Sequence, residues 1–152
     1  GTAQVKDVKS GNLSGVVLAD EGASAADLTA DQFIFAPVQS LLVFGESEGT
    51  ERLFGRAGDD LINGGDGVNL LTGQGGADIF FLTDGASDRI LDFGNGADLI
   101  DVSDWGVASF DELEVTGLGL NKTVTDGVNV AIVQTELELG AESFIFGFDV
   151  LT

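Results

Sequence analysis

Residues 46–81 read ESEGTERLF GRAGDDLIN GGDGVNLLT GQGGADIFF when they are written in groups of nine. Glycine holds the fourth position of all four groups, and position six is Glu51, Asp60, Asn69 or Asp78. Positions seven and eight are mostly aliphatic or aromatic. Because glycine allows tight turns and the apolar residues supply a short strand, each nonapeptide predicts a turn of about six residues and a strand of about three.

The nine-residue period indicates which β structure to expect. It does not match the period of an amphipathic helix, and it is too short for an array of hairpins. A three-residue strand cannot bury its apolar side chains alone, so neighbouring repeats must stack. The sequence therefore predicts an all-β fold with a right-handed parallel β-roll. The pattern continues more loosely to residue 101, where Asp88 and Asp98 each stand two residues before an isoleucine, as Asp60 does.

The pattern changes after residue 102. Ser109–Glu112 reads as a capping box that starts a short helix. Leu113–Thr116 and Thr123–Thr125 have the composition of strands. Asp126-Gly127 is a hairpin signal that leads into Val128–Val133. We therefore expect a C-terminal antiparallel β cap with a short helix.

Composition excludes several classes of function. The chain has 152 residues with 26 acidic and 6 basic side chains, a net charge of −20, and 43% hydrophobic residues. Nucleic acid is excluded as an electrostatic partner, and a cation is the more natural one. With no His and no Cys, zinc sites built on those ligands, His-based triads, thiol nucleophiles and disulfides are impossible. No apolar run is long enough to span a membrane, and residues 1–10 do not resemble a signal peptide of the general secretory route.

The nonapeptides resemble the repeat-in-toxin (RTX) pattern G-G-x-G-x-D-x-U-x, in which U is a large aliphatic residue. The sequence after them is similar to the C-terminal module of serralysin-type proteases and of other type I secreted bacterial proteins. Four ordered motifs carry that similarity, namely Asp88–Phe93, Asp98–Ser103, Ser109–Leu113 and Phe144–Phe146. The resemblance implies a calcium-binding, haemolysin-type module that is secreted and extracellular. It also implies passage, unfolded, through an ABC-transporter (type I) machinery, with a signal at Asp149–Thr152.

Geometry supports calcium independently of the resemblance. Parallel strands lie about 4.8 Å apart, so turns stacked along one edge share that spacing. An oxygen-ligated Ca²⁺ lies roughly 2.3–2.6 Å from its ligands and can bridge two such turns. Since turns alternate between the two edges of a roll, position six pairs Asp60 with Asp78 on one edge. The other edge pairs Glu51 with Asn69, and Asn69 with Asp88.

Backbone carbonyls at positions one and three would complete the ligand shells, because glycine-rich turns leave them accessible. The expected carbonyl donors are Gly55, Ala57, Gly64, Asp66, Gly73 and Gly75. We expect the Asp60/Asp78 pair to be the main site, a site at Asn69 to be second and one at Glu51 to be the weakest. Asn69 keeps an oxygen ligand but lacks the charge, and Asp98 is expected to serve the final turn.

The two ends of the chain share a pattern, since residues 28–36 align with residues 139–147 and both contain Phe-Ile-Phe. We therefore divide the chain into three parts. Residues 1–40 are a β-rich segment resembling the end of a preceding module. Residues 41–102 are the RTX β-roll, and residues 103–152 are the cap with the expected secretion signal.

These observations predict a binding module without catalytic residues, carried by a larger secreted protein that it stabilises by folding on calcium. The alternative is a calcium-dependent module that binds polysaccharide or serves as an adhesin. Trp105 is expected to fill the core at the end of the roll rather than to stack on a sugar.

Overall fold

The structure is a computed structural model, and it describes residues 3–4, 17–18, 40–46 and 49–148. Contacts divide the chain into two compact units, residues 1–37 and 38–152. Within the first unit, β1 (Ala3–Gln4) and β2 (Val17–Leu18) form an antiparallel pair. The predicted likeness of residues 28–36 to the C-terminal end lies outside the described residues.

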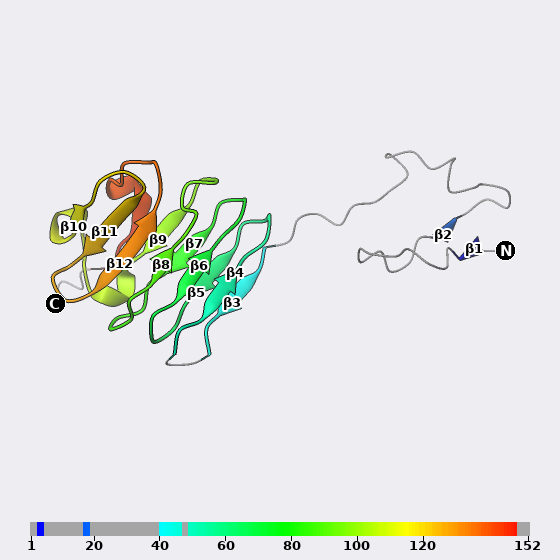
Figure 1. Cartoon of the computed structure of the whole chain (residues 1–152), viewed down its shortest axis with the longest axis horizontal. Helices are drawn as coiled ribbons and strands as arrows, with labels where there is room; N and C mark the ends of the chain where they lie inside the picture. The colour runs from blue at the N-terminus through cyan, green and yellow to red at the C-terminus, as the bar shows by residue number, and fades with distance from the viewer. Residues whose placement is uncertain (1–2, 5–16, 19–39, 47–48, 149–152) are drawn as a thin grey trace. The chain divides into compact units, whose positions relative to one another are not determined.

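A parallel β-solenoid of about three turns forms the first half of the second unit (Figure 1). The chain crosses between two sheets at every turn, so consecutive strands belong to different sheets and alternate strands pair. Every strand of the solenoid is three residues long or shorter, as the nonapeptide pattern predicts. They are β3 (Leu42–Phe44), β4 (Arg52–Phe54), β5 (Leu61–Asn63), β6 (Leu70–Thr72), β7 (Ile79–Phe81), β8 (Arg89–Ile90) and β9 (Leu99–Asp101).

In the roll, the second residue of each strand is directed into the core. Successive side chains of a strand point to opposite faces, so a three-residue strand directs only its middle side chain inward. Phe80 is completely buried, and so are its counterparts on neighbouring strands: Ile62, Leu71, Ile90 and Ile100. At the N-terminal end of the roll, Val43 and Leu53 are only partly buried, because β3 and β4 are the last strands of their sheets.

The cap extends both sheets of the roll. It contains β10 (Glu114–Thr116), β11 (Asn121–Thr125), β12 (Val130–Gln134) and β13 (Phe144–Ile145), together with the single 3₁₀ turns η3 (Ser103–Trp105), η4 (Phe110–Glu112) and η5 (Ala141–Ser143). Strands β10, β11 and β12 form an antiparallel meander, and β12 then pairs in parallel with β8. Strand β13 pairs in parallel with β9, so the cap covers the C-terminal edges of both sheets (Figure 1).

The all-β fold predicted from the sequence is confirmed, with one refinement. The short helix expected at Ser109–Glu112 is the single 3₁₀ turn η4. Trp105 is 8% exposed and packs in the core, as expected. No helix in the described part of the chain is long or apolar enough to cross a membrane.

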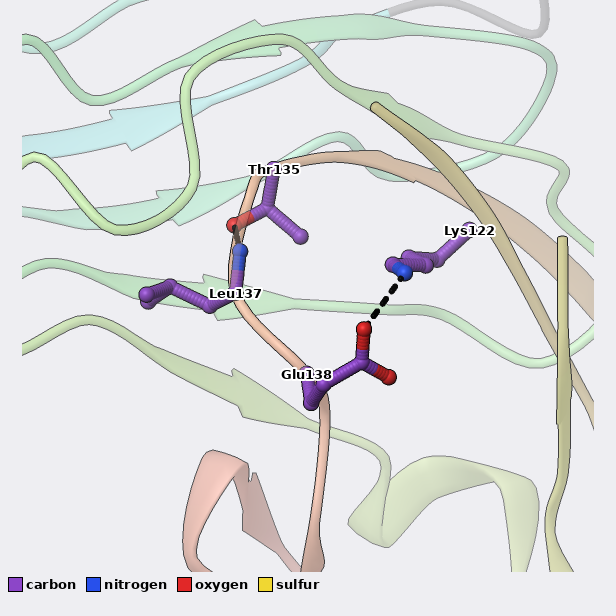
Figure 2. A network of polar contacts seen from close by, with 4 residues as sticks. All are labelled: Lys122, Thr135, Leu137 and Glu138. Atoms are coloured by element: carbon purple, nitrogen blue, oxygen red, sulfur yellow. Dashed lines mark hydrogen bonds and ion pairs between the residues drawn. The ribbon is translucent and has the colours of Figure 1, made fainter. Parts of the chain in front are cut away.

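A lysine side chain occupies an inward-facing position of the cap. Lys122 on β11 alternates with the buried Val124, and its side chain is 9% exposed. Its Nζ lies 3.2 Å from Oε1 of Glu138, whose own side chain is 92% exposed (Figure 2). The backbone N–H of Leu137 donates to Thr135 Oγ1 at 3.1 Å, which fixes the bend that brings Glu138 over the lysine.

Candidate metal centre

Turns of the roll stack along two edges. One edge carries the turns at residues 55–60, 73–78 and 92–98, and we call it the Asp60 edge. The other carries the turns at residues 64–69 and 82–88 with Glu51 stacked beside them, and we call it the Asn69 edge. The pairing of position-six residues predicted from the spacing is therefore present on both edges.

A ladder of carboxylates runs along the Asp60 edge. Asp78 Oδ1 accepts the backbone N–H of Asp60 at 2.9 Å, and Asp98 Oδ1 accepts that of Asp78 at 3.0 Å. Asp60 Oδ1 in turn accepts the N–H of Leu41 at 2.6 Å. The three aspartates are 2%, 1% and 8% exposed in chain order, so one oxygen of each buried carboxylate ties its turn to the previous coil.

The second carboxylate oxygens turn inward to their own turns. Asp60 Oδ2 accepts the N–H of Arg56 at 2.5 Å, and Asp98 Oδ2 accepts that of Gly94 at 2.8 Å. A Cβ added to Gly55 would lie 2.5 Å from Asp60 Oδ2 and 2.6 Å from the carbonyl oxygen of Gly73. Oxygens from two successive turns thus converge beside Gly55, and only a residue without a side chain leaves them room.

The Asp60 edge concentrates negative charge. The pKa of Asp78 is raised to about 6, first by burial and then by the charges of Asp98, Asp60 and Asp92, against the lowering effect of the Asp60 N–H. Buried like charges disfavour the ionised form, and a cation between the turns would remove that penalty. The electrostatics therefore suit a metal ion with oxygen ligands.

Two residues that the nonapeptide pattern did not single out also contact this edge. Asp92 accepts the backbone N–H groups of Gly73 and Gln74 at 2.9 Å and 2.8 Å. Gln74 has a positive φ of 74°, and its Nε2 donates to the Gly55 carbonyl at 2.7 Å. Gln74 is exposed, so its amide covers that carbonyl from the solvent side.

The Asn69 edge repeats the ladder with one carboxylate replaced by an amide. Asn69 Oδ1 accepts the N–H of Glu51 at 3.1 Å, and Asp88 Oδ1 accepts that of Asn69 at 3.1 Å. The pKa of Asp88 is raised to about 6 by burial, against the lowering effect of hydrogen bonds from Asn69. Asp88 Oδ2 is buried and has no hydrogen-bond partner, so this edge also retains a carboxylate oxygen that can bind a further group.

The remaining sequence-predicted donors lie in the turns of these two edges. Ala57 and Gly75 occupy third positions on the Asp60 edge, and Gly64 and Asp66 occupy the first and third positions on the Asn69 edge. In the described part of the chain, no group of three or more acidic side chains gathers around one point. A metal shell here must therefore include backbone carbonyls, which are ordinary calcium ligands.

Comparison with known families agrees with this geometry. Residues 47–80 match the family model of the RTX calcium-binding nonapeptide repeat in four copies. No curated protein matches the chain. RTX nonapeptide repeats bind calcium ions and form structural rather than catalytic modules. The four matched repeats and the parallel solenoid that they build fit an RTX-type calcium-binding domain.

Proposed function

We propose that this domain folds on binding calcium along the Asp60 edge and thereby stabilises a larger protein exported by type I secretion. The observation that carries the proposal is the ladder of buried carboxylates at Asp60, Asp78 and Asp98. One oxygen of each carboxylate joins neighbouring coils. We assign the ions to the second oxygens, which for Asp60 and Asp98 also accept an N–H of their own turn, together with turn carbonyls.

The proposed ligands follow the stacking of the turns. On the Asp60 edge they are the carboxylates of Asp60, Asp78 and Asp98 and the carbonyls of Gly55, Ala57, Gly73 and Gly75. Calcium binding along the Asp60 edge does not require the corresponding oxygens of the Asn69 edge, which are the carbonyls of Gly64 and Asp66 and the carboxylate of Asp88. The position-one glycine at Gly55 supports this assignment, because a side chain there would strike both a carboxylate and a carbonyl of the next turn.

Coupling between calcium and folding follows from the charges. Without calcium, the buried carboxylates of the Asp60 edge repel one another, and the net charge of −20 opposes compaction. Extracellular calcium modules have Kd values of about 10⁻⁴–10⁻³ M. Such a chain stays unfolded at low cytosolic calcium and folds outside the cell, because an ion that binds only the folded state stabilises it.

Extracellular location and export by an ABC transporter are part of the same proposal. RTX repeat proteins are typically secreted. A narrow secretion channel passes only an unfolded chain, and a domain that folds only after export satisfies that condition. Any catalysis belongs to other parts of the secreted protein.

Circular dichroism in EDTA and in about 1 mM CaCl₂ tests the proposal. The wild-type domain should gain β structure on addition of calcium, and the Asp60→Ala/Asp78→Ala variant should require at least about tenfold more calcium. Asp111→Ala/Glu114→Ala is the matched control, since it removes two exposed charges from the cap. Full β structure in EDTA at neutral pH would refute the coupling.

Calcium-dependent binding of polysaccharide is the alternative. The chain has one tryptophan, Trp105, which is buried in the core and offers no stacking surface for a sugar. Retention of the calcium-loaded domain on alginate beads, with EDTA elution as the control, would favour the alternative.

A further inference from the structure

We infer that the side-chain amide of Asn69 takes the place, on its own edge, that calcium takes on the Asp60 edge. Metal ions then bridge successive turns on the Asp60 edge, whereas hydrogen bonds alone bridge the turns at Asn69. The inference rests on the proposed calcium binding at the Asp60 edge.

The contacts of Asn69 Nδ2 carry the inference. This nitrogen donates to the carbonyl of Gly64 at 2.9 Å, to the carbonyl of Asp66 at 3.1 Å and to Asp88 Oδ1 at 3.0 Å. The two carbonyls belong to the first and third positions of its own turn, and the carboxylate of Asp88 belongs to the next turn of the same edge. The amide therefore engages the same three kinds of oxygen that a bridging ion would bind.

The hydrogen-bond network fixes the orientation of this amide. Asn69 Oδ1 accepts the backbone N–H of Glu51 at 3.1 Å. Rotating the amide by half a turn would place Nδ2 against that N–H, and would place Oδ1 against the Gly64 and Asp66 carbonyls. Both contacts would be repulsive, so only the observed orientation satisfies the donors and acceptors around it.

An aspartate at position 69 would replace these favourable donor–acceptor contacts with repulsion between oxygens. Its second oxygen would face two carbonyl oxygens and the Asp88 carboxylate, and only a cation could make that arrangement favourable. Asp88 Oδ2, which is buried without a partner, would then be available as a further ligand. The choice between an amide and a carboxylate at this position thus determines whether the coil needs calcium.

Burial and close packing allow the Asn69 amide to bridge the two turns in place of an ion. Asn69 is completely buried, and a Cβ on Gly64 would lie 2.8 Å from Asn69 Nδ2 and 2.7 Å from Asp88 Oδ2. The amide nitrogen and the free carboxylate oxygen thus lie against the same backbone atom. With the amide in place, the two turns are already bridged.

Counting bound ions by native mass spectrometry tests the inference. Asn69→Asp should bind one calcium ion more than the wild type, and Asp60→Asn, the reciprocal exchange on the other edge, should bind at least one fewer. An Asn69→Asp variant that binds no more calcium than the wild type overturns the inference. A wild type that binds no calcium overturns the proposed function instead, and a gain by Asn69→Asp would still support the role of Asn69.

A measurement on the wild type covers the case in which Asn69→Asp does not fold. In the calcium-loaded domain, NMR should detect couplings across hydrogen bonds from Asn69 Nδ2 to the Gly64 and Asp66 carbonyl carbons. The Nδ2 protons should also exchange slowly with solvent. Rapid exchange without these couplings would show that the amide has turned away to admit an ion, and would overturn the inference.

Discussion

At the scale of the residue, each turn of the roll depends on atoms that have little room to move. Gly55 shows this most clearly, because a carboxylate oxygen of its own turn and a carbonyl oxygen of the next turn both approach its Cα. Gly75 occupies a turn of the same edge, yet a Cβ added there would contact nothing within 4 Å. A methyl group would therefore clash at Gly55 and fit at Gly75, although both glycines lie in turns of the same edge.

We expect Gly55→Ala to destabilise the calcium-loaded domain by roughly 1–3 kcal/mol, the usual cost of forcing a methyl group into a packed site. It should also raise the calcium concentration needed for folding, since the Asp60 carboxylate must move. Urea denaturation at saturating calcium measures the first effect, and a calcium titration followed by circular dichroism measures the second. Gly75→Ala is the control, and equal losses in the two variants would contradict the assigned crowding.

At the scale of the element, much of the roll could be predicted from the nine-residue period. Strands β5, β6 and β7 lie at positions seven to nine of their nonapeptides, because large apolar residues recur at positions seven and eight. The period also identified Asp60 and Asp78 as residues that face each other across coils, and it placed Asn69 on the other edge.

Other features depend on contacts that the local pattern does not encode. Pairing of β12 with β8 joins Ile132 to Arg89, and no short-range signal specifies a partner that distant. Asp92 reaches Gly73 and Gln74 because the last turn of the Asp60 edge departs from the nine-residue spacing. The direction of the Asn69 amide follows from its neighbours' donors and acceptors, so the residue type alone could not reveal it.

Strand β11 offers a test of how the cap is stabilised. Lys122 occupies an inward position beside Val124, and its counter-charge Glu138 lies in solvent. We expect Lys122→Leu to stabilise the calcium-loaded domain by about 1 kcal/mol, because a buried charge is replaced by an apolar group while Glu138 stays hydrated. The change in the urea midpoint measures this effect.

Glu138→Gln is the matched control for that prediction. It should destabilise the domain, because the ammonium group stays buried without its counter-charge. Marked destabilisation by Lys122→Leu would show instead that the ion pair itself supports the cap.

At the scale of the whole molecule, protons should partly replace calcium. The pKa values of Asp78 and Asp88 are raised to about 6 from 3.8. A carboxyl group whose pKa is higher in the folded state contributes stability that is fully present below pH 3.8 and is lost as the pH rises through about 6. In EDTA, we therefore expect the domain to be more stable at about pH 5 than at about pH 7.5.

The β-structure content measured by circular dichroism in EDTA at the two pH values checks this expectation, because the domain should gain β structure at the lower pH that it lacks at the higher. The Asp78→Asn/Asp88→Asn variant should show a smaller difference between them, because it lacks both titrating groups. Stability in EDTA that increases from acidic to neutral pH would contradict the prediction.

The two-sheet architecture has a consequence for how the domain can change in length. One nonapeptide carries the chain from one sheet to the other, so a full coil needs two of them. Inserting a single nonapeptide after β6 would move every later turn to the opposite edge, and Asp78 would then stack on Asn69 instead of Asp60. Inserting two would return every later turn to its original edge, with one inserted turn between Asp60 and Asp78 and the other between Asn69 and Asp88. The number of repeats in such a domain is therefore constrained in parity as well as in size, and gains or losses in pairs are the changes that keep its two edges chemically distinct.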